Sequence, residues 1–238
     1  SGSPSMQAKV MTYLGSVESD RASYRRAVGH LEQAVTLSQA AREPRRQAYA
    51  LSMLGRISLF RGALDAAAGQ LDASIKLAED DHWLAFLPWP QALRGEVQLA
   101  RDDPAGAAGL LEQAFARACQ LGDPCWEAMA ARGLALVAEA AGETERAIAM
   151  LAEARARSGR LAEPYLWLDG YILDAQCDLG RRHDHPETAA WVEALRTLAS
   201  RSGMRELTLR SLQHGAALGR AGDSTAAAVL ADELAEYR

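Results

Sequence analysis

The sequence has few lysines, no long apolar run and no excess of positive charge, and each of these absences excludes a class of function. Lys9 and Lys76 are the only lysines, so arginine carries almost all of the positive charge. The formal net charge is −5, which gives no dominant basic field for binding nucleic acid phosphates. No apolar run approaches the roughly 18 residues of a membrane span. We therefore expect a cytoplasmic protein with no direct contact to nucleic acid or membrane.

Cysteine, glycine, proline and the β-branched residues are also few. The three cysteines are an odd number at irregular spacings, which argues against a disulfide framework and favours a reduced compartment. Glycine (19) and proline (8) are too few for a collagen-like or disordered chain. Valine and isoleucine are scarce, and no window alternates as a half-buried strand does. The abundant residues are the helix formers Ala, Leu, Arg, Glu and Gln, so the sequence predicts an all-α fold.

A small residue returns every forty residues and marks a repeat. It stands at Gly15, Gly55, Gly95, Ala135, Ala175 and Gly215. A triplet of the type Ala–Leu–Ala follows it, as in Ala67, Leu71 and Ser74, and the fifth copy reads Glu187, Trp191 and Ala194. We interpret each unit as two helices that pack closely at the small residue. Because one hairpin cannot bury its apolar stripe alone, the pattern predicts about six stacked antiparallel hairpins in one register without insertions.

Turn residues set the expected boundaries of these hairpins. Residues 1–5 resemble an expression-tag remnant, and 6–238 are expected to form one repeat domain. Its units are predicted at about 6–42, 43–82, 83–122, 123–162, 163–202 and 203–238.

The motif Leu54-Gly55…Gly62…Ala67…Leu71…Ser74 resembles the tetratricopeptide repeat (TPR). Its forty-residue period is longer than the common unit and is similar to the sensor regions of MalT-like and LuxR-type bacterial regulators. The resemblance implies a right-handed α-solenoid whose first helices line a concave groove. In the regulators it resembles, a nucleotide-binding module precedes the array and a helix-turn-helix follows it.

The expected groove can be placed by register. Positions six before, three before and one after the small residue share a face of each first helix. Aromatic residues and arginine on that face favour binding. The candidate partner-binding residues on the first helices are Tyr49, Ser52, Arg56, Phe60, Trp89, Glu96, Met129, Arg132, Asp169 and Gln176. Tyr49 and Trp89 could instead fill space between hairpins, whereas a buried packing role suits neither Arg56 nor Arg132.

Motifs for catalysis and for metal binding are missing. No phosphate-binding loop, Gly-x-Ser-x-Gly elbow or His-Glu-x-x-His helix occurs. His183 and His185 are too few ligands for a closed metal site. The aromatic stretch 82–90 is interpreted as a lengthened join packed on the neighbouring hairpin rather than as a ligand loop. We therefore expect no cofactor, no metal and no enzymatic activity.

Two functions fit these expectations, together with a third that we disfavour. The leading hypothesis is a sensor or interaction segment excised from a longer bacterial LuxR/MalT-type transcriptional regulator. Its groove would bind a peptide, a protein domain or a small-molecule effector. The alternative is a free-standing TPR adaptor for protein–protein interaction. A helical enzyme would need a closed pocket with perturbed acids or bases.

Overall fold

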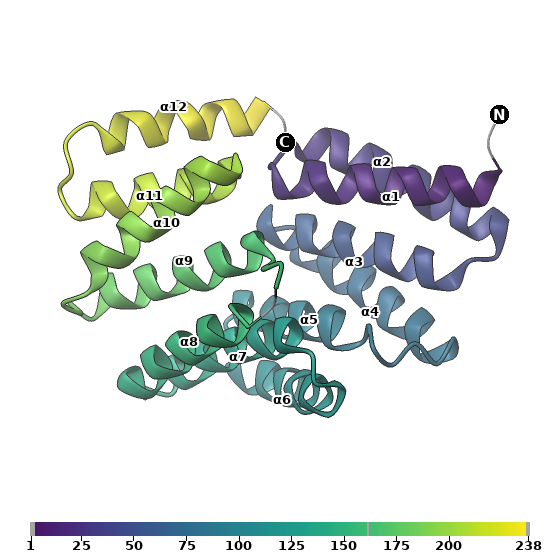
Figure 1. Ribbon diagram of the computed structural model, residues 1–238, viewed down its shortest axis with the longest axis horizontal. Coiled ribbons are helices and arrows are strands. Elements are labelled where there is room, and N and C mark those ends of the chain that lie inside the picture. The colour runs from purple at the N-terminus through teal and green to yellow at the C-terminus, as the bar shows by residue number, and fades with distance from the viewer. Residues whose placement is uncertain (1–2, 161, 237–238) are drawn as a thin grey trace. The chain divides into compact units, whose positions relative to one another are not determined.

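The chain folds into successive antiparallel helix pairs, as Figure 1 shows for the computed structural model, which describes residues 3–160 and 162–236. The described residues contain helices and turns and no strand, which confirms the predicted all-α class. The helices are α1 (Pro4–Asp20), α2 (Tyr24–Ala41), α3 (Pro44–Phe60), α4 (Leu64–Asp80), α5 (Pro88–Ala100), α6 (Pro104–Leu121), α7 (Pro124–Ala140), α8 (Thr144–Ser158), α9 (Leu166–Arg182), α10 (Thr188–Ser202), α11 (Arg205–Ala217) and α12 (Asp223–Glu236). Each odd-numbered helix pairs with the next even-numbered one, so the predicted hairpins are present.

The N-terminal residues begin the first helix. Ser1 and Gly2 of the expected tag remnant lie outside the described residues. Ser3 is the N-cap of α1, and its hydroxyl accepts a bond from the Met6 amide at 3.3 Å. Pro4 follows at the first helical position, where a missing N–H costs nothing.

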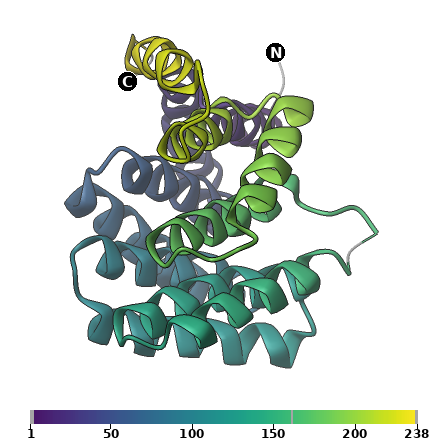
Figure 2. The same cartoon turned by 90° about the vertical axis from the view of Figure 1, so that its left-hand side faces the viewer.

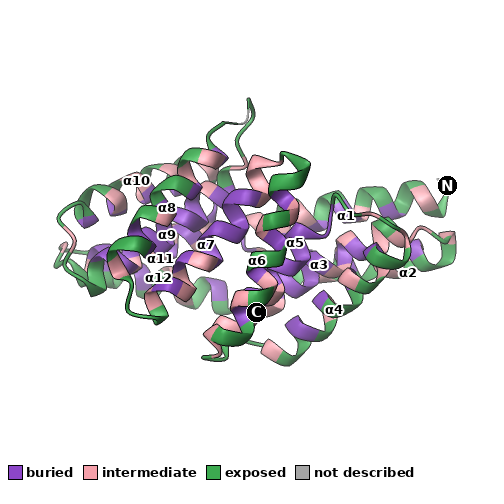
Figure 3. Ribbon diagram, turned by 90° about the horizontal axis from the view of Figure 1, so that it is seen from below, coloured by how far each residue is buried: buried purple, intermediate pink, exposed green. Residues whose placement is uncertain are grey.

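The helices form two compact units, the first ending at Leu121 and the second beginning at Gly122. In the first unit, α2 packs on both α1 and α3, and α4 packs on both α3 and α5. The first helices also touch one another in order, α1 against α3 and α3 against α5. The second unit repeats this scheme from α7 to α12. Buried residues lie along the helix sides that meet within each unit (Figure 3).

The close approach predicted at the small residue is confirmed in the first three hairpins. A Cβ added to Gly15, Gly55 or Gly95 would lie 2.5–2.7 Å from the Cγ of Leu31, Leu71 or Leu111, respectively. Real Cβ atoms do not come so near, so only glycine allows this helix spacing. The last hairpin differs from the prediction. Gly215 lies against the carboxylate of Asp223 instead of an apolar side chain at the centre of the second helix.

Left-handed backbone marks the turn inside each hairpin in the same forty-residue register. Ala22, Gly62, Asp102, Gly142 and Gly222 all have positive φ there. In the fifth hairpin the left-handed residue is Asp184, two positions later.

Because this turn is displaced, the side chains that α10 buries are not the ones that were predicted. The side chains that it buries are Thr188, Val192 and Leu195. The prediction placed Glu187, Trp191 and Ala194 there, one residue too early, and Glu187 is exposed. The repeat is therefore not free of insertions.

Two joins between hairpins are longer than the rest. One covers 81–87, between α4 and α5; the other lies between Ser158 and Leu166, between α8 and α9. Figure 2 shows the helix pairs from a second direction. Phe86, Leu87 and Trp89 are buried, which agrees with a join packed on its neighbour, while Leu84 stays exposed.

Candidate partner-binding surface

Three predicted site residues meet inside the first unit. Ser52 and Arg56 lie on α3, and Trp89 lies on α5. The indole Nε1 of Trp89 donates to the hydroxyl of Ser52 at 3.1 Å, and that hydroxyl donates to the Tyr49 carbonyl at 2.8 Å. The guanidinium of Arg56 lies 6.0 Å from the centre of the Trp89 ring. Register reasoning thus placed these residues on one face, but all three are fully or almost fully buried.

Arg56 links two first helices and does not face solvent. Its guanidinium donates to the Ser19 hydroxyl at 2.7 Å and to the Asp20 carboxylate at 2.6 Å. The side chain of Arg56 is 0% exposed, so the expectation that a buried role does not suit it is wrong. The physical reason is that Asp20, on the neighbouring helix, supplies the opposite charge that burial of a guanidinium requires.

Arg132 gives the same correction in the second unit. Its Nε donates to the carbonyl of Tyr171 at 3.0 Å, and its guanidinium stacks 3.4 Å from the centre of that residue's ring. The Arg132 side chain is buried, as is that of Met129 one turn earlier. A planar guanidinium on an aromatic face is a favourable cation–π arrangement. Arg132 therefore joins α7 to α9.

An open recess of about 300 Å³ lies on the first-helix face of the first unit. Its lining residues are Thr12 and Tyr13 of α1, Arg45, Arg46 and Tyr49 of α3, and Trp83 of the join between α4 and α5. Thr12 and Tyr49 occupy the offsets three and six before the small residue, as the register predicted for a groove. Trp83 was not among the predicted site residues, because it lies in a join that register reasoning assigned to packing.

Aromatic rings form one wall of this recess, which we call the Tyr49 recess. Trp83 stacks on Phe86 with ring centres 4.3 Å apart and planes 9° apart. Tyr49 lies 5.9 Å from Phe86, and the guanidinium of Arg45 lies 5.8 Å from the Trp83 ring. Tyr13 is 62% exposed, so its ring is accessible to a partner.

Two arginines carry the charge of the Tyr49 recess. Arg45 bonds the carboxylate of Asp81 at 2.5 Å, with 58% of its side chain exposed. Arg46 bonds Glu43 at 2.6 Å. Hydrogen bonds from the Ser5 hydroxyl and from Arg46 hold the pKa of Glu43 below its ordinary value. The recess thus combines the apolar faces of aromatic rings with two arginines whose present carboxylate partners could be replaced by those of a ligand.

The remaining predicted residues lie outside the Tyr49 recess. Phe60 is half-buried near the end of α3, and Glu96 is buried on α5. Asp169 forms an ion pair with Arg155 at 2.8 Å. Gln176 is buried, and among the described residues its Oε1 has no hydrogen-bond partner.

A second hollow surface lies in the second unit, and of its lining the sequence reasoning named only Asp169 and Gln176. Two adjoining hollows of about 730 and 530 Å³ share Arg155 and Leu166 and are lined by residues of α8, α9 and α10 with the join before α9. Asp169 and Gln176 line the smaller one. Leu166 is 44% exposed, which leaves an apolar rim. The sequence signal was the small-residue spacing of Ala190 and Ala194 on α10.

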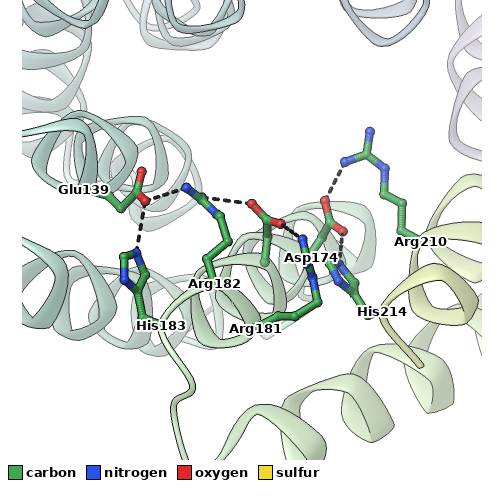
Figure 4. Close-up of polar contacts among 8 residues, drawn as sticks. Glu139, Asp174, Arg181, Arg182, His183, Arg210 and His214 are labelled. Atoms are coloured by element: carbon green, nitrogen blue, oxygen red, sulfur yellow. Dashed lines mark hydrogen bonds and ion pairs between the residues drawn. The ribbon is translucent and has the colours of Figure 1, made fainter. Parts of the chain in front are cut away.

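Carboxylates connect successive first helices of the second unit (Figure 4). Glu139 of α7 binds Arg182 and, at 3.1 Å, His183 at the end of α9. Asp174 of α9 accepts bonds from Arg210 and from His214 of α11, the latter at 3.0 Å. Burial by itself raises the pKa of Asp174, but the charges of Arg210 and His214 outweigh it and leave the pKa well below its usual range. These contacts join successive repeats of the second unit.

In the described part of the chain possible metal ligands do not cluster, and two of the three cysteines have a raised pKa. Residues 3–160 and 162–236 contain no group of three or more His, Cys, Asp or Glu side chains arranged to hold a metal. Burial raises the thiol pKa of both Cys125 and Cys177 to about 12, so both stay protonated. None of the described helices has the length and apolar character that crossing a bilayer demands.

Solved structures share this arrangement of helices. A Rap protein, solved in complex with Competence and Sporulation Factor, superposes with a TM-score of 0.72 at 14% identity over 98% of this chain. The fold is TPR-like. Two crystal structures of nearly identical TPR-like repeats from a putative kinesin light chain of Podosopora anserina give TM-scores of 0.52 and 0.51 at 16% and 17% identity, over 85% and 84% of this chain and 98% and 97% of theirs.

The similarity to these structures covers the fold of the chain and only part of the length of the Rap protein. The chain spans 66% of the length of the Rap chain. No family model and no curated protein matches the sequence. The comparisons therefore establish the TPR-like fold and leave the regulator context of the sequence resemblance as a hypothesis.

Proposed function

We propose that this chain is a non-catalytic interaction domain that binds an acidic peptide segment of a partner protein in the Tyr49 recess. The observation that carries the proposal is an open recess in which the exposed ring of Tyr13 and the half-buried rings of Tyr49 and Trp83 lie beside two arginines. Aromatic side chains and arginine provide much contact area and directed hydrogen bonds for each side chain that is ordered. The Rap structure shows a protein of this fold in complex with a factor, which supports a binding role.

The charges of the recess favour an acidic partner. An exposed ion pair such as Arg45–Asp81 contributes only about 0–1 kcal/mol, so a partner carboxylate can exchange with Asp81 at little cost. The apolar side chain next to that carboxylate would then lie on Trp83 or Tyr49. Strand addition is not available as a binding mode, because the described residues offer no sheet edge.

Selection from a random peptide library tests this proposal. We expect the selected peptides to combine Asp or Glu with an aromatic or aliphatic residue. Replacing Tyr49 or Arg45 by Ala should weaken binding of a selected peptide by about tenfold or more, measured by fluorescence polarisation. Arg26→Ala is the matched control, because Arg26 is an exposed, ion-paired arginine on α2 outside the recess. Peptides without acidic residues, or equal binding by Tyr49→Ala, would exclude the Tyr49 recess as the site.

At the finer level, we propose that the domain is the sensor segment of a LuxR/MalT-type transcriptional regulator. The support is the forty-residue period, which the left-handed turn residues Ala22, Gly62, Asp102 and Gly142 follow in register. If the protein is such a regulator, Tyr49→Ala in the native gene should change the transcript levels of a defined set of genes. If the protein is instead an adaptor, the variant should lose co-purifying proteins while transcript levels stay unchanged. That result would contradict the regulator assignment.

A further inference from the structure

The outer face of α1 carries five large apolar side chains that are exposed. Met6, Val10, Tyr13, Leu14 and Val17 are 56%, 45%, 62%, 42% and 50% exposed. Their spacing of three and four residues places them in one stripe along the helix. The buried residues of α1, which are Ala8, Thr12, Gly15 and Ser19, follow the opposite side. Hence α1 has two packing faces, of which only one is covered.

The repeat itself shows what such a face does. Forty residues later, Ala50, Met53, Leu54 and Ile57 occupy the same positions on α3 and are between 0% and 6% exposed. There α2 packs on α3, and in the next hairpin α4 packs likewise on α5, where Leu93 and Val97 are fully buried. In this fold the face is therefore a packing surface for another helix. Among the described residues of the first unit no helix covers this face of α1, and its side chains are exposed.

We propose that α1 of a second copy covers this stripe, with the two helices antiparallel about a two-fold axis. Positions 10, 13, 14 and 17 are symmetric about a point between Tyr13 and Leu14. An antiparallel pair centred at that point sets Val10 opposite Val17 of the second copy, and Tyr13 opposite Leu14. A two-fold interface needs such self-complementarity, because each copy presents the same patch to the other.

The charges beside the stripe permit this pairing. The five stripe residues are all uncharged, so no charge is desolvated at the axis. Asp20 is already held by Arg56, and Glu18 lies 3.6 Å from Arg26. Like charges therefore do not oppose each other across the two-fold axis.

The size of the stripe sets the strength of the dimer. From Met6 to Val17 it is about 17 Å long at 1.5 Å per residue. One helix pair of this length falls at the small end of protein interfaces, below about 1,200 Å². We therefore expect a reversible dimer whose population rises with concentration, with a dissociation constant in the range of roughly 1–100 μM.

The test is sedimentation velocity of the whole chain at roughly 1 to 200 μM, a range set around that dissociation constant. We expect the mass to rise from that of the monomer, 25.6 kDa, toward twice that value. Val10→Lys and Val17→Glu should each remove the rise, since each variant would bury two unpaired charges in the dimer, one from each copy. Val229→Lys is the matched control, because Val229 is a 55% exposed valine on α12 outside the stripe. Unchanged circular dichroism and melting temperature would show that the variants remain folded.

A complementation experiment tests the antiparallel register. Because residue 10 faces residue 17 of the second copy, a mixture of the Val10→Lys and Val17→Glu chains should form a heterodimer although neither dimerises alone. The double variant Val10→Lys/Val17→Glu should likewise regain the dimer. A monomer at all concentrations, failure of the mixture to pair, or masses beyond a dimer would each overturn the proposal. Tyr13 belongs to both this stripe and the Tyr49 recess, so the two proposals are tested with different variants. Val10 and Val17 do not line the recess, and Arg45 and Tyr49 do not belong to the stripe, so either proposal can fail while the other holds.

Discussion

Single residues decide how closely the helices of each hairpin can pack. Gly55 on α3 and Gly69 on α4 are both helical glycines, but their surroundings are opposite. A Cβ on Gly55 would meet the Leu71 side chain at 2.6 Å, whereas a Cβ on Gly69 would have nothing within 4 Å. Glycine is therefore needed at the first position and only tolerated at the second.

Replacing each of these glycines by alanine tests the repeat at this scale. Gly55→Ala should destabilise the protein by roughly 1–3 kcal/mol, because overpacking forces Leu71 or the helix to shift. Gly69→Ala should stabilise it by up to about 1 kcal/mol, because alanine favours the helix. Urea denaturation of both variants measures the two free energies of unfolding. A neutral Gly55→Ala would mean that the helices of the hairpin are not held at this spacing.

The arginines show where reasoning about single residues stops. Register placed Arg56 and Arg132 on the first helices, and both lie there. Their burial depends on Asp20 and on Tyr171, which lie 36 and 39 residues away in the sequence. A sequence pattern reports the face of a helix, but it does not report which partner on the next helix neutralises a charge. Consequently Arg56→Ala should cost roughly 3 kcal/mol of folding stability.

Between elements, polar contacts supplement the apolar ones. Asp174 joins α9 to α11 through Arg210 and His214, and it is 6% exposed. In the folded protein its pKa lies below that of the unfolded chain, about 3.9. The stabilisation that it provides is therefore complete above this pH. It decreases as the pH falls further, because the unfolded state then takes up the proton first.

The Asp174→Asn variant tests this contact between elements. At pH 7 it should lose roughly 1–3 kcal/mol, because Arg210 loses one counter-charge but is partly exposed and keeps its ion pair with Glu206. The difference from the wild type should shrink below about pH 4, as the linkage argument requires. Asp178→Asn is the control on the same helix; its carboxylate is 41% exposed, so a loss below about 1 kcal/mol is expected. A pH-independent difference for Asp174→Asn would show that its charge does not stabilise the fold.

On the scale of the whole molecule, each of the two units has its own buried residues and its own hairpin contacts. In the first unit these include Leu31, Ile57, Leu71 and Leu93, each at most 1% exposed. In a repeat protein stability is roughly a sum of contributions from neighbouring repeats, and about three repeats are enough for independent folding.

Expression of residues 1–121 alone tests this independence. The fragment should show a helix content by circular dichroism that accounts for α1–α6, and it should unfold cooperatively with heat. A fragment without cooperative unfolding would show that the first three hairpins need the rest of the chain. The fragment 122–238 provides the reciprocal measurement.

The sequence by itself determined the helix pairs, their order and the glycines at the close approaches, because these follow from periodicity and side-chain volume within about forty residues. The tertiary structure alone decided which polar side chains are buried, since that depends on partners from neighbouring repeats such as Asp20 and Arg56. It also revealed the displaced register at Asp184 and the place of Trp83 beside Tyr49. A one-residue shift leaves composition unchanged, and a join has no periodicity from which its side chains could be placed.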